Sequence, residues 1–224
     1  GESGSGKSTT ARLALALERA DAGEVRLLGQ DWTSLKEPRR RALRREISVV
    51  YQDPLSSFDP RWDVERILTD AVGRTELSTR AARRERVTEL LALVGLTPAV
   101  LGRSPLTLSG GQRQRVAIAR ALAPWPAVVV LDEAVSALDV SIQAQILDLL
   151  VTLQAKLGLS YLFISHDLGV VSHLADRVLV MKDGLVVEHG TVEKVFEQPA
   201  HPYTRELIAA LHTLPDPATT SEGK

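Results

Sequence analysis

The first eight residues constrain the fold of this chain more than any other feature. Gly1-Glu2-Ser3-Gly4-Ser5-Gly6-Lys7-Ser8 fits the pattern G-x-x-x-x-G-K-S/T, which forms a phosphate-binding loop between a strand and a helix. Glycines let such a loop turn its backbone N–H groups inward toward phosphate oxygens, and the following helix adds the positive end of its dipole. The alternative is a Gly/Ser linker with an accidental Lys-Ser pair. A helical pattern directly behind the motif weighs against that alternative.

Each position of this loop has an expected role toward a nucleotide. The lysine reaches the β- and γ-phosphates and the next hydroxyl ligates Mg²⁺, so we predict these roles for Lys7 and Ser8, with Thr9 at the α-phosphate. The loop backbone completes the nucleotide site at Gly1, Ser3, Gly4 and Gly6. Because no strand precedes the motif in this sequence, we expect the first strands of the domain to be missing.

Strands alternate with helices along the rest of the chain, which predicts a parallel α/β core. We expect strands at 24–28, 47–51, 127–131 and 160–164, and a hairpin of 176–181 and 185–188 around Asp183-Gly184. We expect helices at 8–20, 38–45, 80–94, 110–123, 140–157, 191–196 and 203–211, and a frayed tail after residue 214. The mostly helical stretch 53–122 predicts a helical subdomain inserted into the core.

Two acids follow the apolar run Val128-Val129-Val130-Leu131. Ligands bind at the carboxyl ends of strands in open α/β sheets, so we predict that Asp132 holds Mg²⁺, through water, and that Glu133 polarises the attacking water. The alternative is a strand end that turns polar where it reaches solvent. The phosphate loop favours the functional interpretation, because phosphoryl transfer needs both a cradle and a metal-holding acid.

A second anion site is indicated by Leu108-Ser109-Gly110-Gly111-Gln112. Ser109 is a good N-cap residue, whereas two glycines at a helix start cost stability relative to alanine. We infer that an anion approaches the backbone N–H groups there; the alternative is a flexible turn before an ordinary helix. Two phosphate-type sites in one chain predict either two nucleotides or one that is shared between two copies.

Composition excludes several other classes of protein. The 224 residues contain no cysteine, which excludes disulfides and thiolate metal sites. The formal net charge of -1 gives no global field toward nucleic acid or an anionic membrane. Five arginines cluster at 39, 40, 41, 44 and 45. Without interleaved aromatic residues we interpret them as a solvated helix face and predict no nucleic-acid partner.

These motifs together resemble the ATPase subunit of ABC transporters. Gly1–Ser8 resembles the Walker A loop, Leu108–Gln112 the LSGGQ signature and Val128–Glu133 the Walker B strand. Gln52 resembles the Q-loop glutamine, Ser136-Ala137-Leu138-Asp139 the D-loop, and His166 the switch histidine. The segments 51–61, 132–145 and 201–204 are similar to ATPases of oligopeptide, dipeptide and nickel importers.

The resemblance implies a P-loop ABC ATPase fold and roles for individual residues. Residues 1–52 and 123–198 would form the RecA-like ATP-binding core, 53–122 the helical subdomain, and 199–224 a C-terminal extension. The implied catalytic residues are Lys7, Gln52, Glu133 and His166, and the magnesium ligands are Ser8, Gln52 and Asp132. Bound ATP would also contact the signature and the D-loop of a facing domain, at Ser109, Gly110, Gly111, Gln112 and Asp139.

The resemblance also implies partners and a place in the cell. Two cassettes, identical or different, would close head to tail around two ATP molecules. They would lie on the cytoplasmic face of the membrane as peripheral subunits, in contact with transmembrane permease subunits and, indirectly, with an extracytoplasmic solute-binding protein. The main hypothesis is an ATPase that drives import of peptides or a similar solute. The alternatives are an ATPase of a non-transport assembly such as carbon–phosphorus lyase, or an ABC protein of DNA repair or translation.

Overall fold

The computed structural model describes residues 1–212. The chain divides into two compact units. We call Ser8–Ile164 the sheet unit, and Gly1–Lys7 together with the residues from Ser165 onward the hairpin unit.

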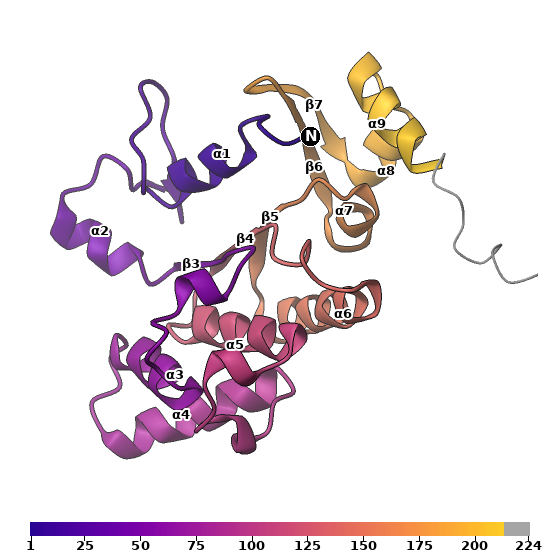
Figure 1. Cartoon of the computed structure of the whole chain (residues 1–224). Helices are drawn as coiled ribbons and strands as arrows, with labels where there is room; N and C mark the ends of the chain where they lie inside the picture. The colour runs from indigo at the N-terminus through magenta and orange to yellow at the C-terminus, as the bar shows by residue number, and fades with distance from the viewer. Residues whose placement is uncertain (213–224) are drawn as a thin grey trace, which may run out of the picture. The chain divides into compact units, whose positions relative to one another are not determined.

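A parallel three-stranded sheet forms the centre of the sheet unit (Figure 1). β4 (Val128–Asp132) lies between β3 (Ile47–Val50) and β5 (Ser160–Ile164). Val128 is in register with Ile47 on one side and with Ser160 on the other. The middle of β4 is buried, as expected for an apolar run in a parallel sheet that is covered on both faces. The acids after this run therefore lie at the carboxyl edge of the sheet.

The N-terminal part of the sheet unit packs on this sheet through a small apolar cluster. It comprises α1 (Lys7–Ala14), the antiparallel pair β1 (Arg26–Leu27) and β2 (Gln30–Asp31), and α2 (Glu37–Leu43). Trp32 is fully buried in the cluster, beside Ala11 of α1, Val130 of β4 and Ile164 of β5. This packing fixes α1, and with it the residue after the phosphate loop, against the sheet.

Helices α3 (Val64–Gly73), α4 (Arg80–Leu93) and α5 (Gly110–Leu122) pack against one another. The side chains of Asp63 and Thr79 cap α3 and α4, because they accept the N–H groups of Arg66 and Ala82. The connections contain the 3-10 helices η1 (Leu55–Ser57), η2 (Pro98–Val100) and η3 (Pro105–Thr107). α5 contacts both β3 and α6 (Val140–Leu157), which joins the helices to the sheet.

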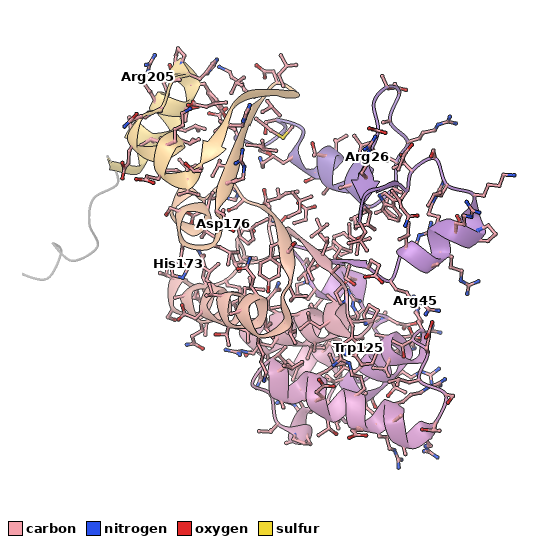
Figure 2. The ribbon with its side chains drawn as sticks, turned by 180° about the vertical axis from the view of Figure 1, so that it is seen from behind. Arg26, Arg45, Trp125, His173, Asp176 and Arg205 are labelled. Carbon is pink, nitrogen blue, oxygen red and sulfur yellow. The ribbon has the colours of Figure 1, made fainter. Side chains whose placement is uncertain are left out.

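A buried arginine ties α4 to the end of α5. Arg86 is only 4% exposed, and its Nη2 donates to the carbonyl of Leu122 at 2.7 Å. Its Nη1 pairs with Glu89 at 2.7 Å, and its guanidinium carbon lies 3.9 Å from the ring centroid of Trp125. Figure 2 labels Trp125 at this position, beside the helices. The arginine is thus a second donor to a carbonyl at the C-terminus of α5, which also accepts the N–H of Trp125 at 3.1 Å.

We expect Arg86→Met to lower the free energy of unfolding by about 2 kcal/mol, because it removes the buried bond to the Leu122 carbonyl and the ion pair with Glu89 while the side-chain stem is retained. Urea denaturation followed by circular dichroism measures this change. Arg84→Met, at an exposed position of the same helix, is the matched control and should shift the midpoint little. Equal midpoints for the two variants would contradict the assignment.

In the described residues, the hairpin unit contains Gly1–Lys7, an antiparallel hairpin and three helices. Its elements are α7 (Leu168–Leu174), β6 (Arg177–Lys182), β7 (Leu185–Thr191), α8 (Val192–Glu197) and α9 (Pro202–His212). Asp183 and Gly184 have φ of 50° and 80°, which matches a two-residue hairpin turn with both central residues at positive φ. Val178, Val180, Val195 and Tyr203 form the apolar cluster of this unit.

The predicted α/β class is confirmed, and most predicted elements are present within two or three residues. Helix α1 is shorter than predicted and ends at Ala14. Leu13, Leu15 and Leu17 alternate with a period of two and do not form one helical face, and Ala16 has φ of 50°. Helices α3 and α7 and strand β2 were not predicted individually. The predicted frayed tail lies outside the described residues.

Among residues 1–212, no helix combines the length and the hydropathy that crossing a bilayer requires.

Candidate functional site

The phosphate loop folds around the side chain of its own lysine. Lys7 Nζ donates to the carbonyl oxygens of Gly1 at 2.8 Å and Glu2 at 2.7 Å, and lies 3.5 Å from Ser5 Oγ. Gly4 and Gly6 have φ of 81° and 97°, a region that other residues enter only with strain. The lysine charge is therefore held over a loop whose turn requires glycine, as an anion cradle needs.

The hairpin supports this loop from within the same unit. The N–H of Gly184 donates to the carbonyl of Ser5 at 3.2 Å. A Cβ at Gly1 would lie 2.1 Å from the carbonyl oxygen of Met181, so no side chain fits at residue 1. The sequence analysis explained this glycine by the flexibility that the loop needs. The structure adds a second reason, because the Met181 carbonyl approaches residue 1 closely.

Ser8 and Asp132 lie together in the sheet unit. Ser8 Oγ is 3.4 Å from Asp132 Oδ1, because α1 packs against the sheet whose central strand ends at Asp132. A hydroxyl and a carboxylate are hard oxygen donors, which Mg²⁺ prefers. Within residues 1–212 no cluster of three or more His, Cys, Asp or Glu side chains is arranged to hold a metal. A hydroxyl and carboxylate pair of this kind fits a Mg²⁺ that takes water and substrate phosphates as its other ligands.

Glu133 follows β4 in an unusual backbone conformation. Its φ is 50°, which costs free energy for a residue with a side chain and persists where the surrounding structure over-determines it, often at functional sites. Its N–H donates to the carbonyl of Ile164 at the end of β5, at 3.0 Å. This bond continues the sheet for one residue and fixes where the Glu133 side chain leaves the strand.

The start of α5 has a complete capping box. Ser109 Oγ accepts the N–H of Gln112 at 3.2 Å, and Gln112 Oε1 accepts the N–H of Ser109 at 3.1 Å. Gly111 is buried, and a Cβ there would lie 2.8 Å from the side chain of Ile142 in α6. Helix packing is therefore a sufficient reason for this glycine. The predicted approach of an anion to this helix start stays a prediction.

Three further predicted residues lie on exposed connections. Gln52 follows β3 and Asp139 directly precedes α6, and both are exposed. His166 is exposed after β5, and Asp167 caps α7 by accepting the N–H groups of Gly169 and Val170. The cap of α7 is therefore Asp167, and His166 lies next to it on the connection.

The predicted residues divide between the two units. Gly1, Ser3, Gly4, Gly6, Lys7 and His166 belong to the hairpin unit, and Ser8, Thr9, Gln52, Ser109, Gly110, Gly111, Gln112, Asp132, Glu133 and Asp139 to the sheet unit. The structure brings together Ser8 with Asp132, and Lys7 with the loop carbonyls. The roles assigned to the individual residues stay predictions.

A cavity of about 960 Å³ lies in the sheet unit, beyond the loop that carries Gln52. It is lined by the rings of Phe58 and Trp62 and by arginines of α2, the turn after α2, the end of α3 and α5, among them Arg41, Arg45 and Arg120. Arg120 donates to the carbonyl and hydroxyl of Ser57, and burial lowers the pKa of its guanidinium. The sequence analysis interpreted Arg41 and Arg45 as part of a solvated face, and both are exposed. It did not predict the cavity, because no local pattern brings α2 close to α5.

An ion pair lies within the same loop. Arg61 donates to both carboxylate oxygens of Asp59, at 2.9 and 2.7 Å, and this lowers the pKa of Asp59 to about 2. The Asp59 carboxylate therefore stays charged at any physiological pH.

Comparison with known sequences finds ATP-binding proteins of transporters among the relatives of this chain. Residues 1–136 match the ABC transporter family. The probable peptide ABC transporter ATP-binding protein y4tS of Sinorhizobium fredii is 50% identical over 97% of this chain and 62% of its own length. The oligopeptide transport ATP-binding proteins OppD of Mycobacterium tuberculosis and OppF of Escherichia coli are 51% and 48% identical over 97% of this chain. The chain spans 35% of that OppD and 65% of that OppF.

Solved structures of similar fold include an ABC transporter component and an ATP-binding cassette. CbiO1 of Clostridium perfringens, part of the ABC transporter complex CbiONQ, superposes with a TM-score of 0.80 and 30% identity, over 88% of this chain and 77% of that chain. The ATP-binding cassette MJ0796, dimeric and bound to ADP and Pi in a post-hydrolysis state, gives 0.75 and 30%, over 85% of this chain and 82% of that one. The predicted P-loop ABC ATPase fold and the resemblance to oligopeptide transport ATPases are confirmed.

Proposed function

Because this chain belongs to the ABC transporter family, we propose that it binds ATP with Mg²⁺ and hydrolyses it to drive import of peptides or a similar small solute. One observation carries the proposal. A glycine-dependent loop closes over Lys7 and leads into α1, whose Ser8 lies 3.4 Å from Asp132 at the end of β4. Cradle, lysine, hydroxyl and metal-holding acid are the parts that phosphoryl transfer requires.

Residues of the phosphate loop, of α1 and of the end of β4 have separate roles at the nucleotide in this proposal. The loop N–H groups from Gly1 to Gly6, with Thr9, bind the phosphates, and Lys7 neutralises the charge of the β- and γ-phosphates. Ser8 and Asp132 hold Mg²⁺, which supplies charge neutralisation at the phosphates when it is bound. The strained backbone at Glu133 supports its role as the group that orients the attacking water and accepts its proton.

Gln52 and His166 complete the catalytic set. Gln52 contributes to the magnesium site and senses the γ-phosphate, and His166 holds the γ-phosphate and the attacking water in position. Their exposure on connections that directly follow the parallel strands β3 and β5 supports both roles, because ligands of open α/β sheets bind at the carboxyl ends of strands. Positioning and charge stabilisation supply most of the rate acceleration.

A second cassette completes each site in this proposal. The capping box uses the N–H groups of Ser109 and Gln112, which leaves those of Gly110 and Gly111 to bind the γ-phosphate of ATP on the partner. Asp139 precedes Val140, whose side chain is 84% exposed, and Leu106 before the signature is 65% exposed. Apolar side chains this exposed beside predicted ligands support burial against a facing domain.

Permease subunits are the proposed partners at the cavity. The loop with Gln52 runs from β3 to Phe58 and Trp62 of the cavity wall, so a partner seated there would sense the state of the nucleotide site. An acidic side chain entering the cavity would offset the cost of burying the Arg120 charge. Such contacts would hold the protein at the cytoplasmic face of the membrane, with a solute-binding protein acting on the permease from the other side.

The proposal is tested first at Lys7. We expect Lys7→Ala in the full-length protein to weaken MgATP binding about 30-fold, since hydrogen bonds between charged groups contribute about 2 kcal/mol. Isothermal titration calorimetry measures the Kd. Lys156→Ala, which removes an exposed lysine from the last turn of α6, is the control and should bind as the wild type does. Wild-type affinity in Lys7→Ala would overturn the nucleotide site.

An ATPase of a non-transport assembly such as carbon–phosphorus lyase would use the same catalytic residues. The two hypotheses are therefore distinguished by the proteins that bind this chain. Peptide-transport names among the relatives favour the transporter. Purification from native membranes should yield proteins with several membrane spans. Co-purifying enzymes of phosphonate metabolism would instead support the alternative.

A further inference from the structure

We propose that Tyr203, in the C-terminal α9, is a positioning residue for the phosphate loop. The N–H of Glu2 donates to the Tyr203 hydroxyl at 3.0 Å, although the two residues are 201 positions apart in the chain. Both belong to the hairpin unit. The inference rests on the proposed function only in that the loop binds a nucleotide.

The bond fixes one peptide plane on both of its edges. The N–H of Glu2 and the carbonyl of Gly1 belong to the same peptide unit, which is planar. The N–H is bound by Tyr203, and the carbonyl accepts Lys7 Nζ at 2.8 Å. Rotation of this plane would break both bonds together. The Tyr203 hydroxyl therefore determines where the loop offers its first carbonyl to the lysine.

Tyr203 is itself held firmly enough to act as such a support. Its side chain is 5% exposed and packs in the apolar cluster with Val178, Val180 and Val195. Lys182 Nζ lies 4.6 Å from the centroid of its ring. The ring therefore has its own packing role, and the hydroxyl can be removed separately from it.

The segment before Tyr203 is anchored to the hairpin as well. Glu188 of β7 accepts the N–H of Ala200 at 2.8 Å and that of His201 at 3.1 Å. His201 Nδ1 accepts the N–H of Tyr203 at 3.2 Å. These bonds set the start of α9, so the hydroxyl reaches Glu2 from a fixed base. The C-terminal segment thus contributes to the nucleotide loop at the other end of the chain.

The test removes the hydroxyl alone, by Tyr203→Phe in the full-length protein. The matched control is Tyr161→Phe, which deletes a hydroxyl that donates to the carbonyl of Leu150 at 2.9 Å in the sheet unit. We expect Tyr203→Phe to speed hydrogen exchange at the Glu2 amide, measured without nucleotide, and to raise the Kd for MgATP, each about fivefold. Tyr161→Phe should change neither quantity, and the two variants should have similar melting temperatures.

Each possible result decides the matter. Wild-type exchange at Glu2 would overturn the proposal, because the hydroxyl would not be holding that amide. Faster exchange with an unchanged Kd would overturn it too, because the bond would then be only structural. If the wild-type protein fails to bind MgATP, the proposed function fails instead, and exchange at Glu2 still decides whether Tyr203 anchors the loop.

Discussion

Glu133→Gln is expected to bind MgATP with wild-type affinity and to hydrolyse it about a thousandfold more slowly, because a positioned general base contributes about 10²- to 10⁴-fold. Glutamine has nearly the same shape as glutamate and retains a hydrogen-bonding oxygen, but it cannot accept a proton from water at neutral pH. The backbone of Glu133, with its φ of 50° and its N–H bound to Ile164, should be unaffected. The substitution therefore separates chemistry from folding and from binding.

Two measurements in the full-length protein check this expectation. Phosphate release under saturating MgATP gives the rate, and calorimetry gives the Kd. Glu85→Gln, an exposed position on α4, is the control and should keep the wild-type rate. Hydrolysis by Glu133→Gln within about tenfold of the wild type would remove Glu133 from its role as general base.

Ser109→Arg is expected to abolish the ATP-driven dimer while nucleotide binding to each protomer is retained. Ser109 is exposed at the start of α5, where the proposal requires close approach of ATP from a facing cassette. An arginine there fills that space, whereas the phosphate loop lies elsewhere in the chain. The dimer is best measured in the Glu133→Gln background, in which bound ATP is not consumed, by light scattering after size exclusion.

The same substitution also removes the cap of α5, which costs about 1 kcal/mol, so loss of the dimer alone is ambiguous. Ser109→Thr retains both the hydroxyl and the cap and should dimerise as the wild type does. Melting curves show whether Ser109→Arg is folded. A folded Ser109→Arg protein that still dimerises with ATP would contradict a site shared between two cassettes.

The parts of the fold and site that the sequence predicted depend on local patterns. The apolar run of β4 identifies a buried parallel strand, and the spacing of glycine and lysine identifies the phosphate loop. Ser109 caps α5 as predicted, by accepting the N–H of Gln112. In each case the information lies within a few neighbouring residues.

What the sequence did not predict depends on contacts between distant segments. The steric need for glycine at Gly1 comes from the Met181 carbonyl, and that at Gly111 comes from Ile142. The hydroxyl that accepts the N–H of Glu2 belongs to Tyr203. The segment around Tyr203 was identified only by its resemblance to a family. The arginine-lined cavity forms because α2 and α5, which are distant in the sequence, both contribute residues beside the loop 57–62. No periodicity or propensity in the chain encodes such proximity.

The close approach at Gly111 has a mechanical consequence. With no side chain at that residue, the first turn of α5 rests directly on Ile142 in the first turn of α6, and close-packed contacts of this kind yield little under load. We therefore expect a displacement of the Asp139 end of α6 to displace the Ser109 end of α5 as well. A neighbouring molecule that binds one of these helix starts is then expected to move both.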